Sequence, residues 1–91
     1  MEIQSIGVVG AGQMGNGIAH VMALAGYDVF LNDISAEALE AAVARIDKNI
    51  ERQVQKGSVA ADEKASAMAR IKTTTELSEL GPLDLIIEAA T

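Results

Sequence analysis

The sequence predicts an α/β fold built on a doubly wound parallel sheet, and three observations carry that prediction. A continuous apolar run over residues 6–9 leads into a glycine-rich turn, as in a buried strand that ends in a tight loop. Apolar residues at helical spacing follow over residues 13–25. A second short apolar run, residues 28–33, begins just after Gly26. A strand, a helix and a strand in this order are typical of parallel sheets.

The first strand is expected over residues 3–9, where Gly7 indicates that another segment approaches the backbone closely. In the helix over residues 13–25, the larger apolar side chains recur on one side as a stripe, and Ala19 and Ala23 beside it keep that face of the helix thin. The second strand, residues 28–33, ends in the carboxylate of Asp33. The stripe consists of Met14, Ile18, Val21, Met22 and Ala25.

A helical hairpin is expected between the second and third strands. Ser35 is a suitable N-cap, and apolar residues spaced three and four apart predict a long helix to about Lys56, ended by Gly57. A second helix is predicted over residues 61–70. One helix is enough to join two parallel strands, so the hairpin is an addition to the basic fold.

The end of the sequence completes half of a doubly wound sheet. A β-branched run over residues 71–75 predicts a strand near the sheet edge, and residues 76–80 predict a short helical turn stopped by Gly81 and Pro82. Residues 83–90 predict a fourth strand. The order β-α-β-α-α-β-β is that of a Rossmann-type half with strand order 3-2-1-4. A ligand crevice is then expected at the carboxyl ends of strands 1 and 4, flanked by residues 88–91.

The turn after the first strand has the pattern of a dinucleotide-binding loop. Gly10 would permit the sharp turn, Gly12 the approach of a pyrophosphate, and Gly15 the close packing of helix on strand. The helix start would then present free N–H groups to the anion. Asp33 follows about 20 residues later, where a carboxylate accepts hydrogen bonds from the adenosine ribose. No arginine follows it to hold a 2′-phosphate, so NAD is favoured over NADP.

Composition excludes several other functions. The net charge is −6 and no cluster of lysine or arginine is present, so nucleic acid and anionic membranes are not expected partners. No cysteine is present, which excludes disulfides and thiolate metal sites and is compatible with the cytoplasm. We expect no signal peptide, no membrane span and no metal site. The lone histidine, His20, has no carboxylate at helical spacing, so a structural role is favoured over a catalytic one.

Several stretches together resemble the N-terminal NAD-binding domain of the 3-hydroxyacyl-CoA dehydrogenase family, above all its bacterial 3-hydroxybutyryl-CoA members. The matching stretches are residues 7–19, 25–29, 32–35, 70–75 and 84–89, together with the long hairpin. One departure is Ala60, where the family often has serine or threonine as a helix cap, and we expect the start of the second hairpin helix to fray.

The resemblance implies reversible, NAD-dependent oxidation of the 3-hydroxyl group of a short acyl-CoA. It places Asp33 on the adenosine ribose and Ala89 behind the nicotinamide side of the cofactor. The hairpin is expected to close over CoA, with Lys48, Arg52 and Lys56 as candidate phosphate contacts. The residues that it places at the pyrophosphate are Gly10, Gly12, Gln13, Met14 and Gly15.

The family's catalytic residues and its helical dimerisation domain are expected beyond residue 91. The resemblance therefore assigns no catalytic residue here and makes residues 1–91 the N-terminal, cofactor-binding portion of an enzyme of fatty acid metabolism. Such a portion is expected to be inactive alone, and the full-length enzyme to be a homodimer. Two alternatives remain open. One is the NAD(P) domain of a β-hydroxyacid dehydrogenase, although the pair Asn32-Asp33 is evidence against it. The other is a non-catalytic NAD-binding module.

Overall fold

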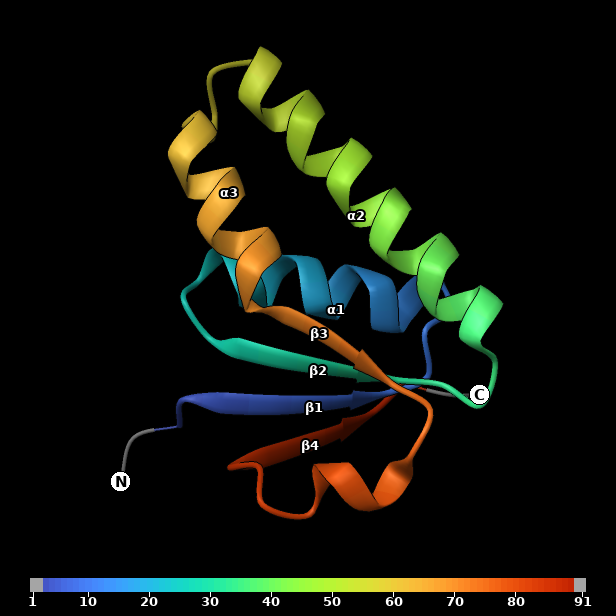
Figure 1. The fold of residues 1–91 in the computed structure, drawn as a ribbon. Coiled ribbons are helices and arrows are strands. Elements are labelled where there is room, and N and C mark those ends of the chain that lie inside the picture. Colours follow the sequence, from blue (N-terminus) through green and yellow to red (C-terminus); the bar gives the residue numbers. More distant parts are fainter. Residues whose placement is uncertain (1–2, 90–91) are drawn as a thin grey trace.

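Three helices cover one face of a four-stranded parallel sheet, and a short 3₁₀ helix lies on the other side (Figure 1). The computed structural model describes residues 3–89. The strands are β1 (Ser5–Val9), β2 (Asp28–Asn32), β3 (Ile71–Thr74) and β4 (Leu85–Glu88). Their order in the sheet is β3-β2-β1-β4, and every pair is parallel. The predicted Rossmann-type half-sheet is therefore confirmed.

Strand β1 lies at the centre of the sheet. Gly7 pairs with Phe30 of β2 on one side and with Ile86 of β4 on the other. A Cβ atom on Gly7 would lie 3.0 Å from a side-chain carbon of Leu83 and 3.3 Å from one of Leu80. The predicted close approach at Gly7 is thus made by the segment around the 3₁₀ helix η1 (Leu77–Leu80).

Helix α1 (Gln13–Leu24) packs on the sheet through its smallest side chains. Its buried residues are Gly15, Asn16, Ala19 and Ala23. The predicted apolar stripe is only partly buried: Ile18 and Met22 pack against the core, whereas Met14 is 58% exposed and Val21 is 60% exposed. The small side chains of Ala19 and Ala23 let the helix axis come close to the strands, as expected of a thin helix face.

The hairpin consists of α2 (Ala36–Gln55) and α3 (Ala61–Arg70), in agreement with the predicted helices. The Ser35 side chain accepts a hydrogen bond from the N–H of Ala38, as expected of an N-cap. The chain leaves α2 through Gly57, which has φ of +81°. At the start of α3 the Glu63 carboxylate accepts a 3.0 Å hydrogen bond from the N–H of Ala60. This bond supplies half of a capping box, so the missing side-chain cap at Ala60 is partly compensated.

One lysine joins the two hairpin helices. The Nζ atom of Lys64, on α3, lies 2.6 Å from a carboxylate oxygen of Asp47 and 3.0 Å from one of Glu51, both on α2. Hydrogen bonds to these carboxylates raise the pKa of Lys64. The two acids are four residues apart and would repel each other on an isolated helix. Lys64 neutralises this repulsion and ties α3 to the middle of α2.

The core lies between the sheet and α2. Its fully buried large side chains include Val8, Val29 and Leu31 of the sheet and Ile46 and Ile50 of α2.

No helix in the described part of the chain is long and apolar enough to span a lipid bilayer.

Strand β4 is anchored at its start by Asp84. One carboxylate oxygen of Asp84 accepts hydrogen bonds from the N–H groups of Gln4 and Ser5, at 2.9 and 3.1 Å. These bonds lower the pKa of Asp84. They fix β4 beside β1, so the carboxyl ends of both strands reach the same edge of the sheet.

Candidate cofactor site

The glycine loop joins the carboxyl end of β1 to the start of α1. Gly10 has φ of +103°, and its N–H donates a 2.7 Å hydrogen bond to the carbonyl of Asn32 at the end of β2. A Cβ atom on Gly15 would lie only 1.7 Å from the carbonyl oxygen of Gly10. These two glycines are therefore required by the packing of the protein itself.

Gly12 differs from these two glycines, because neither its backbone conformation nor its packing within the protein requires a glycine. Its φ of −68° suits any residue, and a Cβ atom there would meet no protein atom within 4 Å. It stands at the N-cap of α1, where no side chain caps the helix and no acid lies in the first turn. The N–H groups of Gln13 and Met14, next in the chain, have no acceptor within residues 3–89. An exposed helix start with free donors and a missing side chain fits the pyrophosphate of a dinucleotide.

Asp33 lies beside this loop, directly after β2. One carboxylate oxygen accepts a 2.9 Å hydrogen bond from the N–H of Ala11, and the other accepts a 3.0 Å bond from the N–H of Ser35. The bond from Ala11, then that from Ser35, lowers the pKa of Asp33 below its ordinary value of 3.8. The carboxylate is therefore ionised at neutral pH, and each oxygen keeps further lone pairs for the hydroxyl groups of a ribose.

Ala89 lies at the carboxyl end of β4. Its N–H donates a 2.8 Å hydrogen bond to the carbonyl of Val9, and its side chain is buried. The pairing of Val9 with Glu88 places Ala89 beside the first glycine of the loop. The carboxyl ends of strands 1 and 4, where the crevice is expected, thus lie side by side as far as residue 89. Ala90 and Thr91, which were expected to flank it, lie outside the described residues.

Three residues that no sequence motif singled out border this region. Ile34, next to Asp33, is 95% exposed. The amide group of Asn16 donates a 2.8 Å hydrogen bond to the carbonyl of Ala42 and so ties α1 to α2. Arg45 lines a cavity of about 190 Å³ together with Gly12. The sequence could have identified Ile34, because a large apolar residue that directly follows the expected ribose carboxylate is not expected to be part of the core.

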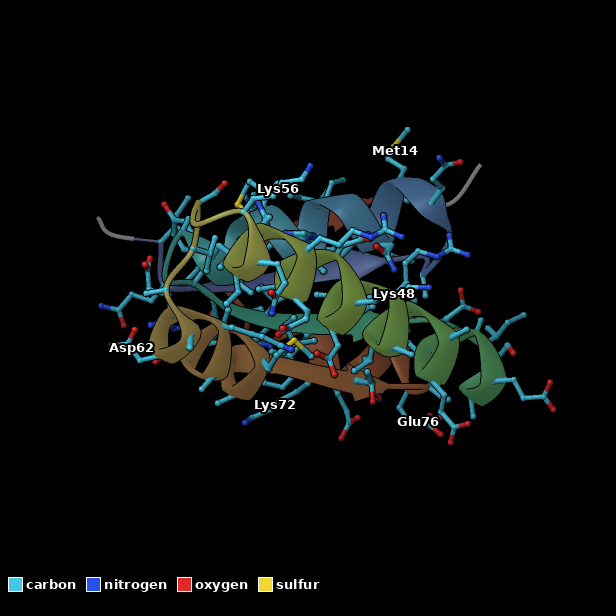
Figure 2. The ribbon with its side chains drawn as sticks, turned by 90° about the horizontal axis from the view of Figure 1, so that it is seen from above. Met14, Lys48, Lys56, Asp62, Lys72 and Glu76 are labelled. Atoms are coloured by element: carbon cyan, nitrogen blue, oxygen red, sulfur yellow. The ribbon has the colours of Figure 1, made fainter. Side chains whose placement is uncertain are left out.

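His20 and Met14 point to other parts of the molecule. A ring nitrogen of His20 lies 2.7 Å from the side-chain oxygen of Gln53 on α2, so the histidine joins two helices. Met14, in the first turn of α1, lies on the side of that helix away from α2 (Figure 2). In residues 3–89 no group of three histidine, cysteine or acidic side chains could hold a metal ion.

The basic residues of α2 and of its C-cap lie along one side of the helix. They follow one another at spacings of three, four and four, and all are exposed. None of them forms an ion pair within residues 3–89, where Lys64 makes both salt bridges. Lys56 lies on the side of α2 nearer α1, whereas Lys72 and Glu76 lie on the opposite side (Figure 2). The basic residues are Arg45, Lys48, Arg52 and Lys56.

Comparison with known proteins supports the same interpretation of the chain. The model of the family "3-hydroxyacyl-CoA dehydrogenase, NAD binding domain" matches residues 5–91. The 3-hydroxybutyryl-CoA dehydrogenase of Bradyrhizobium diazoefficiens is 52% identical over 88 residues, which are 97% of this chain and 30% of that protein. The corresponding protein of Bacillus subtilis, described as probable, is 43% identical over 98% of this chain and 31% of its own length. The chain thus spans about 30% of the length of such relatives.

Solved structures of 3-hydroxybutyryl-CoA dehydrogenases have the same fold as this chain. The crystal structure of 3-hydroxybutyryl-CoA dehydrogenase from Escherichia coli K12 matches with a TM-score of 0.96 and 38% identity, over 100% of this chain and 19% of that one. The (S)-3-hydroxybutyryl-CoA dehydrogenase from Ralstonia eutropha matches with a TM-score of 0.95 and 43% identity, over 99% and 32%. These matches favour this family over the β-hydroxyacid dehydrogenases. The chain belongs to the 3-hydroxyacyl-CoA dehydrogenase family and corresponds to its NAD-binding domain.

Proposed function

We propose that residues 1–91 form the cofactor-binding part of an NAD-dependent short-chain 3-hydroxyacyl-CoA dehydrogenase, which interconverts a 3-hydroxyl group and a ketone. The observation that carries the proposal is the open start of α1 beside the ionised Asp33. It occurs in a chain that is 52% identical to a 3-hydroxybutyryl-CoA dehydrogenase. The names of the relatives support the substrate class, and the geometry of the glycine loop and Asp33 supports the cofactor contacts.

Each proposed contact has a physical reason. The N–H groups of Gln13 and Met14 and the positive end of α1 attract the pyrophosphate, which Gly12 admits. Asp33 accepts hydrogen bonds from the adenosine ribose, and its charge disfavours a 2′-phosphate. The exposed side chain of Ile34 offers an apolar surface to the adenine ring. Ala89 bounds the nicotinamide end of the crevice. When bound, NAD supplies the hydride acceptor, and these residues only bind and orient it.

The remaining parts of the proposal concern the protein around this domain. We propose that the catalytic base, the acyl site and the dimerisation domain belong to a longer protein, which works as a homodimer in the cytoplasm and in fatty acid metabolism. The fraction of the relatives' length that this chain spans, about 30%, supports this division.

The isolated chain is therefore expected to bind NADH without oxidising it. A titration followed by NADH fluorescence should saturate, because the proposed pyrophosphate and ribose contacts all lie within residues 10–33. Addition of acetoacetyl-CoA should leave the absorbance of NADH unchanged. Turnover by the isolated chain would contradict the placement of the catalytic groups elsewhere, and failure to bind NADH would contradict the cofactor site itself.

The basic side of α2 is the proposed contact for the phosphates of CoA. Arg52 and Lys56 are exposed, they have no acidic partner in residues 3–89, and they lie in the half of α2 remote from the glycine loop. A phosphate group attracts such cations without requiring a preformed pocket. Lys48 and Arg45 extend the same row toward the loop.

Replacing Lys56 by glutamine should raise the dissociation constant for CoA about threefold to fivefold, the size expected of one exposed charge contact. Isothermal titration of the chain with CoA measures this constant. Lys72→Gln is the matched control, because Lys72 lies on the opposite side of α2 (Figure 2). An equal effect of both variants would show that only net charge matters, and the proposed contact would then be abandoned.

A further inference from the structure

A groove beside β3 is not used by any of the contacts proposed so far. It forms a cavity of about 710 Å³ between the first half of α2 and the end of β3. Leu39 and Val43 of α2 provide its apolar wall, and Thr73 and Thr75 provide the wall on the side of the sheet. The crevice expected at β1 and β4 lies on the far side of β2, and of the proposed cofactor contacts Asp33 adjoins the groove, through the bond from its N–H to the carbonyl of Thr74.

The wall formed by β3 carries unpaired backbone groups. Within residues 3–89, β3 is an outer strand and pairs only with β2. The carbonyl of Thr74 accepts a 3.3 Å hydrogen bond from the N–H of Asp33, so Thr74 directs its backbone groups toward β2. Because these directions alternate along a strand, the N–H and C=O of Thr73 point to the outer edge. An outer edge of this kind is a template for one more strand.

The groove is also acidic. Glu40 of α2, together with Glu76 and Glu79 from the segment after β3, lines it, and no basic residue does. Glu79 accepts a hydrogen bond from the hydroxyl group of Thr74, but Glu40 and Glu76 form no ion pair within the described residues. Lys64 does not line the groove, and its charge is shared between Asp47 and Glu51 of α2. Two exposed carboxylates thus face the groove without a cation.

We propose that this groove docks an extended peptide segment in which basic and aliphatic side chains alternate, and which adds to β3 as a further strand. Its backbone would pair with that of Thr73, its aliphatic side chains would pack on Leu39 and Val43, and its lysine or arginine side chains would reach Glu40 and Glu76. Strand β3 has four residues, about 13 Å of length, so the docked segment is about four to six residues long. A second copy of this chain fits poorly, because its net charge is −6.

The proposal does not depend on cofactor binding, and a synthetic peptide tests it directly. The probe is a fluorescein-labelled octapeptide of alternating valine and lysine, and its anisotropy is measured during titration with the chain. Binding should saturate, and the variant Glu40→Gln/Glu76→Gln should raise the dissociation constant about tenfold. Asp28→Asn/Asp62→Asn is the matched control, because it removes the same charge at two exposed sites outside the groove. This control should change the constant less than about twofold.

A second probe separates strand addition from simple charge attraction. The same octapeptide, methylated on alternate backbone nitrogens, cannot pair with Thr73 and should bind at least about tenfold more weakly. Equal binding of both peptides, or equal weakening by both double variants, would overturn the proposal. So would absence of binding, which would mean that Lys72 on β3 protects the edge. Dimerisation of the chain in sedimentation experiments, lost in Glu40→Gln/Glu76→Gln, would assign the groove to a second copy and would also overturn it.

Discussion

Gly15→Ala should lower the free energy of unfolding by about 3–5 kcal/mol, a large part of the stability of a domain of this size. The added Cβ atom would lie 1.7 Å from the carbonyl oxygen of Gly10, which is backbone and cannot rotate away. Either α1 must move off β1 or the glycine loop must open, and both changes would disrupt the start of the helix. Urea denaturation followed by circular dichroism measures the loss.

Gly17→Ala is the matched control on the same helix. A Cβ atom on Gly17 would meet nothing within 4 Å, and the residue is exposed. Alanine is a better helix former than glycine, so this variant should gain about 0.5–1 kcal/mol. If the two substitutions had effects of the same sign and size, the close contact between Gly15 and Gly10 would not be the cause.

Asp33→Asn should raise the dissociation constant for NADH about tenfold to a hundredfold. Hydrogen bonds to a charged acceptor contribute about 1.5–3 kcal/mol, and the substitution removes the charge and one acceptor oxygen. Binding of NADPH should weaken much less, because the repulsion of its 2′-phosphate is removed at the same time. Fluorescence titrations of both cofactors give the two constants. A ratio of NADPH to NADH affinity that is unchanged by the substitution would refute the role proposed for Asp33.

Two controls accompany this experiment. Asp28→Asn removes a carboxylate from the opposite end of β2 and should leave both constants unchanged. The pH dependence is the second control, because the N–H groups of Ala11 and Ser35 hold the pKa of Asp33 below 3.8. The carboxylate remains ionised as long as the pH is above that value. NADH affinity should therefore show no step from this group between about pH 6 and 8.

The three glycines of the loop show how much of the cofactor site the sequence motif could predict. The spacing of Gly10, Gly12 and Gly15 indicated a dinucleotide loop, but it treated the three glycines alike. In the structure, Gly10 and Gly15 are demanded by backbone geometry and packing, whereas only Gly12 is left for a ligand to explain. This separation depends on distances between residues 10 and 15 that no sequence pattern contains.

Helix α1 was predicted only in part. Periodicity correctly located the helix, because it reports the repeat of the backbone. It located the buried side only in part, because Ile18 and Met22 pack against the core but Met14 and Val21 are exposed. Contact with the sheet is made through Ala19 and Ala23, whose size sets how closely the helix can approach. The ion pair of Asp47 was hidden as well, since its partner Lys64 lies on the next helix.

The sequence by itself determined the elements, their order, the parallel sheet and the class of cofactor. These properties rest on local signals: apolar runs, helical periodicity, caps, and a glycine loop at a set distance from Asp33. Only the tertiary structure decided which apolar residues of α1 are buried, how Lys64 and Asp84 lock neighbouring elements, and that an acidic groove borders the outer edge of β3. Each of these depends on contacts between residues distant in the chain, and such contacts exist only once the sheet and helices have packed.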